Sequence, residues 1–133
     1  MTRTTPWAAL ALAAGIAMAI PPPTHAQEPV DPRIAAYDKG PATIDVSKYP
    51  TEMQARYKVF ADKCAKCHTL ARAINCEFAL DEEWERYVKR MMRKPGSGIT
   101  SADGKQIFEF VAHDAKVRKK ALYERKLKEG AKP

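Results

Sequence analysis

Cys64 and Cys67 are separated by two residues and His68 follows directly, so two thiols and an imidazole stand within five positions. On a helical turn, two thiols at this spacing can each bond one vinyl carbon of a haem, while the adjacent imidazole coordinates the iron from one side. The spacing is typical of c-type haem attachment. A chain that attaches a haem in this way folds around it, which would constrain the architecture more than any other feature here.

The same residues allow three other interpretations. A redox-active dithiol normally follows a strand and opens a helix, whereas here a helical pattern runs into Cys64 and no strand pattern precedes it. A disulfide within the motif would close a very tight ring. A zinc site needs four ligands, which the chain supplies only within one short stretch, by Cys64, Cys67, His68 and Cys76. We therefore expect haem c, with one iron, as the cofactor.

The first 26 residues, 1–26, predict a secretory signal peptide. A positive start at Arg3 precedes an apolar run over 7–20, which as a helix would be roughly 21 Å long and shorter than a bilayer core of about 30 Å. Three prolines at 21–23 end that helix, and Ala26 offers a small residue at the cut. An uncleaved membrane anchor is the alternative. We expect export to the periplasm, where c-type haem is attached in bacteria.

The composition is that of one small basic domain. The chain has 133 residues, 45% of them apolar, and 23 lysines and arginines against 16 aspartates and glutamates, a net charge of +7. This length permits one domain, and the apolar fraction permits a packed core. Three cysteines are too few for a dense disulfide scaffold. Export and the lack of a nucleic-acid motif argue against nucleic acid as a partner, in spite of the charge.

Proline and glycine divide the mature chain. Residues 27–50 hold four prolines and one glycine, which predicts an extended arm over the domain or a flexible leader. Helical patterns follow, and no segment shows sustained strand alternation, so the predicted class is all-α. We expect 51–113 to form the haem domain and 114–133 to form a long basic C-terminal helix.

Local signals place three main helices in this region. Two of them begin at a threonine that fits a capping box, and one begins at a run of acidic residues, which the helix dipole favours. The expected helices cover 51–64 (capping box of Thr51 with Gln54), 81–94, and 100–129 (capping box of Thr100 with Asp103), with a long loop over 69–80.

The stretch from Phe60 to Leu70 resembles the haem-binding stretch of mono-haem bacterial cytochromes c, in which an aromatic residue stands four positions before the first cysteine. A later segment, in which Met91 follows Trp84 by seven positions, is similar to small periplasmic, class I-like members of that family. The resemblance covers 51–113 and implies a small cytochrome c-like helical fold wrapped round one haem. It also implies a methionine downstream of the motif as the second axial ligand.

Two positions depart from the pattern of that family. Many relatives carry a glycine eight positions before the first cysteine, where helices cross closely, whereas this chain has Arg56. Many also carry a proline shortly after the motif, whose carbonyl orients the histidine, and no proline occurs here between His68 and Lys94. A different backbone carbonyl, in the loop over 69–80, must therefore hold the His68 ring.

Four side chains are candidates for the second axial position. Met91 lies two turns from Trp84 on nearly the same helix face, so it faces the haem if Trp84 packs on the haem edge. Met92 points about 100° further round, and Met53 lies about 16 Å along its helix from the first cysteine. His113 stands near an expected helix end. We favour Met91, with Met92, His113 or an open position as the alternatives.

Charge and the remaining cysteine indicate the expected partners. Residues 114–129 hold seven basic side chains against three acidic ones, and a second basic cluster over 86–94 flanks Met91. We expect these charges to steer the protein toward an acidic redox partner, with anionic lipid head groups or a merely solvated helix face as the alternatives. Cys76 is either a buried thiol in a monomer or the link in a disulfide-bonded dimer.

These observations predict a carrier of single electrons rather than an enzyme. His68 and Met91 together would leave no open coordination site, which suits electron transfer. The first alternative is a five-coordinate haem protein, such as a peroxidase or a gas sensor, which would need polar groups on an open distal side. The second is a haem subunit of a larger exported oxidoreductase complex, docked through the basic C-terminal helix.

Overall fold

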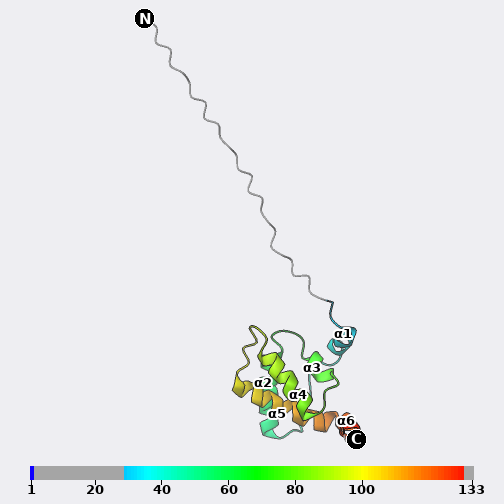
Figure 1. Ribbon diagram of the computed structural model, residues 1–133. Coiled ribbons are helices and arrows are strands. Elements are labelled where there is room, and N and C mark those ends of the chain that lie inside the picture. Colours follow the sequence, from blue (N-terminus) through cyan, green and yellow to red (C-terminus); the bar gives the residue numbers. More distant parts are fainter. Residues whose placement is uncertain (2–28, 131–133) are drawn as a thin grey trace.

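A computed structural model describes Met1 and residues 29–130; nearly all of the predicted signal peptide, with its cleavage point, and the last three residues lie outside the described part. Within that part the chain is helical and has no strand, so the predicted all-α class is confirmed. The helices are α1 Pro32–Asp38, α2 Thr51–Cys64, α3 Ala71–Asn75, α4 Asp81–Met92, α5 Ser101–Arg118 and α6 Lys120–Gly130 (Figure 1).

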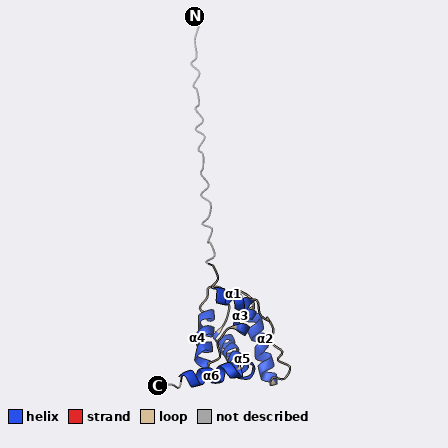
Figure 2. Ribbon diagram, turned by 90° about the vertical axis from the view of Figure 1, so that its right-hand side faces the viewer, coloured by secondary structure: helices blue, strands red, loops and turns tan. Residues whose placement is uncertain are grey.

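Helices α2, α4 and α5 form the body of the molecule, with α5 packed against both of the others. Helices α1 and α3 lie together at one end and α6 at the other, as two views at right angles show (Figures 1 and 2). Phe60 of α2 and Phe110 of α5 are buried in the core between these helices, with ring centroids 5.3 Å apart. Arg56 lies at the same α2–α5 contact and forms an ion pair of 2.7 Å with Glu109.

The predicted start of α5 is confirmed. Thr100 and Asp103 cap each other, because the Thr100 hydroxyl accepts from the Asp103 N–H at 3.1 Å and the Asp103 carboxylate accepts from the Thr100 N–H at 3.0 Å. The predicted capping box at Thr51 is wrong. Pro50 is the N-cap of α2, and the Gln54 side chain instead donates to the Tyr49 carbonyl at 2.9 Å.

The N-terminal arm holds a helix that its prolines argued against. Asp31 caps α1 by accepting from the Arg33 N–H at 2.8 Å, and Pro32 occupies the first turn, where proline needs no N–H partner. The residues after α1 include turns and bends, and Ile44, Val46 and Tyr49 among them pack against the core. The Ile44 N–H donates to the Tyr57 hydroxyl of α2 at 3.3 Å.

The C-terminal region and the predicted loop also differ from the expectation. The single helix expected over 100–129 is divided at Lys119, whose φ of −109° and ψ of 29° leave the helical region. Helix α5 itself runs unbroken through residue 114, where the basic C-terminal segment was expected to begin. The short helix α3 lies inside the loop expected over 69–80. In residues 29–130, no helix has the length and apolar character needed to cross a membrane.

Candidate functional site

A cavity of about 650 Å³ lies beside the cysteine and histidine motif. Its walls come from α1, the end of α2, the segment from α3 to Phe78, and the end of α4 with the loop that follows. This volume falls within the range of about 300–1,000 Å³ that is usual for cofactor and ligand pockets. The four residues predicted to form the site all line it: Cys64, Cys67, His68 and Met91.

Helix α2 delivers the first cysteine to the cavity and ends there, with Ala65 as its C-cap. Cys64 is half-buried and Cys67 is exposed, and both are free thiols. Burial, reinforced by the neighbouring Cys67, raises the pKa of Cys64 to about 11. The Cys64 side chain is therefore a neutral thiol at physiological pH and an inert one until a reactive group is placed beside it.

His68 is held by the backbone immediately after it. Its Nδ1 atom lies 3.0 Å from the carbonyl oxygen of Thr69. Because a carbonyl oxygen only accepts, this contact requires the tautomer with the proton on Nδ1, which leaves the lone pair of Nε2 free to bind a metal. The carbonyl expected in the loop over 69–80 is thus that of Thr69, and no proline is needed to supply it.

The structure separates the four candidates for the second axial position. Met91 lines the cavity. Met92 packs on α5 instead, where a Cβ added at Gly104 would lie 2.5 Å from its sulfur. His113 packs edge-on against the Tyr49 ring, with centroids 5.1 Å apart, and does not line the cavity. Among the described residues, Met91 is the one methionine that lines the cavity with His68, and it is the one that the sequence favours. Met53 does not line the cavity.

Three aromatic side chains build the apolar wall of the cavity. Phe78, Trp84 and Tyr87 pack edge to face, with each pair of centroids 5.7 Å apart. Phe78 and Tyr87 line the cavity, whereas Trp84 is buried behind them. The expectation for Met91 was conditional on Trp84 packing at the haem edge, and Phe78 and Tyr87 were not identified from the sequence. Tyr87 stands three positions after Trp84, so the helical period could have identified it.

Cys76 is a buried thiol and also lines the cavity. Its Sγ donates to the Ala73 carbonyl at 3.1 Å, and burial raises its pKa. A disulfide-linked dimer would require this side chain to leave the core. In residues 29–130 no three His, Cys, Asp or Glu side chains are gathered so that they could hold a metal ion.

Helix α1 covers one side of the cavity, a contribution that the sequence analysis did not identify. Ile34 and Tyr37 of α1 line the cavity. The helix is fixed to α3 by the Asp38 carboxylate, which accepts from the Arg72 guanidinium at 2.6 and 3.1 Å, and by the Asn75 amide, which donates to the Tyr37 carbonyl at 3.1 Å. The hydrogen bonds from Arg72 lower the pKa of Asp38.

The end of α4 carries an exposed group of basic side chains at the cavity, which we name the α4 cluster. Its members are exposed and have no ion-pair partner among the described residues: Arg86, Arg90, Arg93 and Lys94. Arg90 lies over the Tyr87 ring, 5.4 Å from its centroid, and both Arg90 and Lys94 line the cavity. Positive charge is therefore concentrated where the cavity meets solvent.

The geometry thus brings the four predicted site residues to one partly apolar cavity and leaves the competing ligand candidates elsewhere. No protein-family model matches the chain, and no curated protein and no solved structure is significantly similar to it. The functional argument accordingly rests on the chain's own residues.

Proposed function

We propose that this protein is an exported c-type haem protein that carries single electrons. The observation that carries the proposal is a single cavity whose lining includes two thiols, an imidazole and the Met91 thioether. Haem c, when bound, supplies a reversible one-electron couple between ferrous and ferric iron.

The residues present fit such a group. Cys64, the last residue of α2, and Cys67, in the turn that follows, would hold it covalently. His68 and Met91 would hold the iron, because an imidazole with a free Nε2 lone pair and a soft neutral thioether suit iron in both oxidation states. Phe78 and Tyr87 would exclude water from the apolar surface of the cofactor.

The other groups of the chain keep this arrangement in place. The Thr69 carbonyl fixes the orientation and the tautomer of the His68 ring, which is the usual role of an outer hydrogen-bond partner of a metal ligand. The aromatic packing of Trp84 holds Tyr87 against the cavity. His68 is held by the Thr69 carbonyl and Met91 packs against the core, which supports electron transfer over the binding of a further ligand.

The α4 cluster supports an acidic redox partner. Most basic side chains of the C-terminal region are already compensated within the described part, because each residue named here has a carboxylate or carbonyl partner: Lys116, Arg118, Lys119, Lys120, Arg125 and Lys126. Arg90 and Lys94 of the α4 cluster instead stand free at the cavity. We propose that the acidic partner docks there and not on α6. Exposed charge of this kind accelerates the encounter with an acidic partner, and this acceleration decreases as the salt concentration rises.

Attachment of the cofactor is tested on the full chain exported from a host that has the c-type maturation machinery. We expect a pyridine haemochrome spectrum typical of two thioether bonds, and colour that survives acidified acetone. The matched control is the double variant Cys64→Ala, Cys67→Ala, which should retain no covalent pigment. Colourless wild-type protein, or pigment that acid acetone extracts, would overturn the proposal.

Axial ligation is tested by comparing Met91→Ala with Met92→Ala. The first variant should lose the absorption of the iron–thioether bond, and its reduced form should bind carbon monoxide. The second removes a side chain of the same kind from the α4–α5 contact and should leave the spectrum unchanged. Carbon monoxide binding by the unmodified reduced protein at neutral pH would instead favour the five-coordinate alternative.

A further inference from the structure

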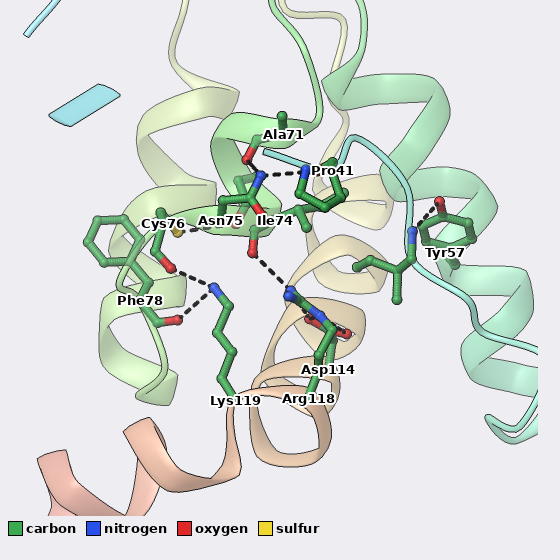
Figure 3. A network of polar contacts seen from close by, with 12 residues as sticks. Pro41, Tyr57, Ala71, Ile74, Asn75, Cys76, Phe78, Asp114, Arg118 and Lys119 are labelled. Atoms are coloured by element: carbon green, nitrogen blue, oxygen red, sulfur yellow. Dashed lines mark hydrogen bonds and ion pairs between the residues drawn. The ribbon is translucent and has the colours of Figure 1, made fainter. Parts of the chain in front are cut away.

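Three cations of the C-terminal region point inward, to the main chain at the end of α3 and in the segment that follows it. Arg118 donates to the carbonyl of Ile74 at 2.9 Å, and Lys119 donates to the carbonyls of Cys76 and Phe78 at 2.7 and 3.3 Å (Figure 3). Lys126 of α6 donates to the Glu77 carbonyl at 2.6 Å. Four carbonyls within five residues therefore receive a charged donor.

Lys119 is the centre of this arrangement. Its ammonium group lies 5.3 Å from the centroid of the buried Trp84 ring, and burial lowers its pKa. An ammonium group taken out of water must be hydrogen-bonded in return, and the carbonyls of Cys76 and Phe78 supply that compensation. The departure of residue 119 from helical geometry accompanies this contact, since the break between α5 and α6 falls at the residue whose side chain reaches inward.

The segment held in this way is a wall of the cavity. Cys76, Glu77 and Phe78 all line it, and Phe78 is part of its aromatic face. Helix α6 buries no residue of its own. Its inward contacts instead run through Lys126, which is bound to the Glu77 carbonyl and, at 2.5 Å, to the Glu83 carboxylate. The contacts of α6 with this wall are therefore polar and directed, and do not depend on a buried apolar face.

We propose that Lys119, supported by Arg118 and Lys126, is a positioning residue for the cavity: it holds the Cys76–Phe78 wall closed and so sets the polarity around the cofactor. The effect on the cofactor rests on the proposed function, whereas the hydrogen bonds from Lys119, Arg118 and Lys126 to the wall, which we call the clamp, are a property of the polypeptide. Two effects of the clamp change the reduction potential in the same direction. A closed wall excludes water and a nearby cation disfavours ferric iron, and both raise the reduction potential.

The test compares Lys119→Met with Lys120→Met in the full-length holoprotein. Both variants lose one positive charge, but Lys120 is exposed and its contact with Glu124 is 3.9 Å long. In Lys119→Met we expect a lower midpoint potential, because the charged donor to the Cys76 and Phe78 carbonyls is lost. We also expect roughly tenfold faster hydrogen exchange at the amides of Ala79 and Leu80, which directly follow the wall. Lys120→Met should change neither quantity.

Two further variants keep the inference falsifiable. Lys119→Arg retains charged donors for the same carbonyls, so it should restore much of the protection and of the potential, which a role in packing alone would not require. If Lys119→Met does not fold, Lys126→Met takes its place in the test. It removes the half-buried outer donor without emptying the core, and should accelerate hydrogen exchange at the same amides by a smaller factor. Equal exchange and equal potential in Lys119→Met and Lys120→Met would overturn the clamp. Loss of pigment from the wild type would overturn the proposed function and leave the exchange measurement valid.

Discussion

The α4 cluster and the C-terminal region are both basic, yet the fold uses them in opposite ways. The four side chains of the α4 cluster face solvent without an ion-pair partner in the described part, and two of them line the cavity. The C-terminal region carries seven basic residues against three acidic ones over 114–129, but Arg118, Lys119 and Lys126 are directed at the protein's own carbonyls. The comparison teaches that charge counted along a sequence is not charge available to a partner.

The largest expected effect comes from Asp114, the buried carboxylate to which the C-terminal region is anchored. Asp114 is 3% exposed and accepts from Arg118 at 2.8 Å and from the Tyr49 hydroxyl at 2.9 Å. Asp114→Asn leaves the Arg118 guanidinium without its counter-charge. We expect a loss of about 3 kcal/mol in the free energy of unfolding, measured by chemical denaturation.

The matched control is Glu124→Gln, which alters the exposed pair with Lys120. Surface pairs of this kind contribute about 0–1 kcal/mol, so this variant should unfold within about 0.5 kcal/mol of the wild type. A similar small change in Asp114→Asn would show that the C-terminal cations are not structural, and the contrast between the two basic regions would fail.

The next effect concerns rate and not stability. Replacing Arg90, Arg93 and Lys94 by Gln should slow oxidation of the reduced protein by ferricyanide, a small anionic oxidant, by roughly tenfold at low salt, because charge at the cavity no longer attracts the anion. The dependence of the rate on ionic strength should flatten as well. The free energy of unfolding should change little, since none of the three has an ion-pair partner in the described part.

The control for charge alone replaces Lys120, Arg125 and Lys128 of α6 by Gln. It removes the same number of positive charges from the end of the molecule opposite α1 (Figure 2). It should retain nearly the wild-type rate. If both triple variants slow the reaction equally, the net charge and not the α4 cluster controls the encounter.

The features that could be predicted from the sequence are those set by near neighbours in the chain. The capping pair of Thr100 and Asp103 involves residues three positions apart, and the site motif occupies five positions. The position of Met91 at the cavity was predicted from its helical spacing to Trp84, although Tyr87 and not Trp84 lines the cavity. In each of these cases the interaction that decides the structure lies within a few turns of one helix.

The features that could not be predicted depend on contacts between distant segments. Helix α1 is fixed by Arg72 and Asn75, more than thirty positions further along the chain. The break at Lys119 depends on carbonyls more than forty positions earlier. No local pattern distinguishes a lysine that reaches such carbonyls from one that faces water, so the sequence suggested a continuous basic helix.

The smallest effect is a pH dependence of the link between α4 and α6. Burial works to raise the pKa of Glu83, but hydrogen bonds from the Ala79 and Leu80 N–H groups and from Lys126 outweigh it, so its pKa is lowered in the folded protein. A lowered pKa contributes stability that is present above the ordinary carboxyl value of 4.5 and is lost as the pH falls through the folded value. Glu83→Gln should therefore cost about 1 kcal/mol at pH 7 and reduce the loss of stability between neutral and acidic pH.

Glu82→Gln changes an exposed carboxylate in the same turn and should keep the wild-type pH profile. If the two variants have the same profile from pH 7 to pH 3, the inward contact of Lys126 with Glu83 does not hold α6, and the stability of the C-terminal region must come from Arg118 and Lys119.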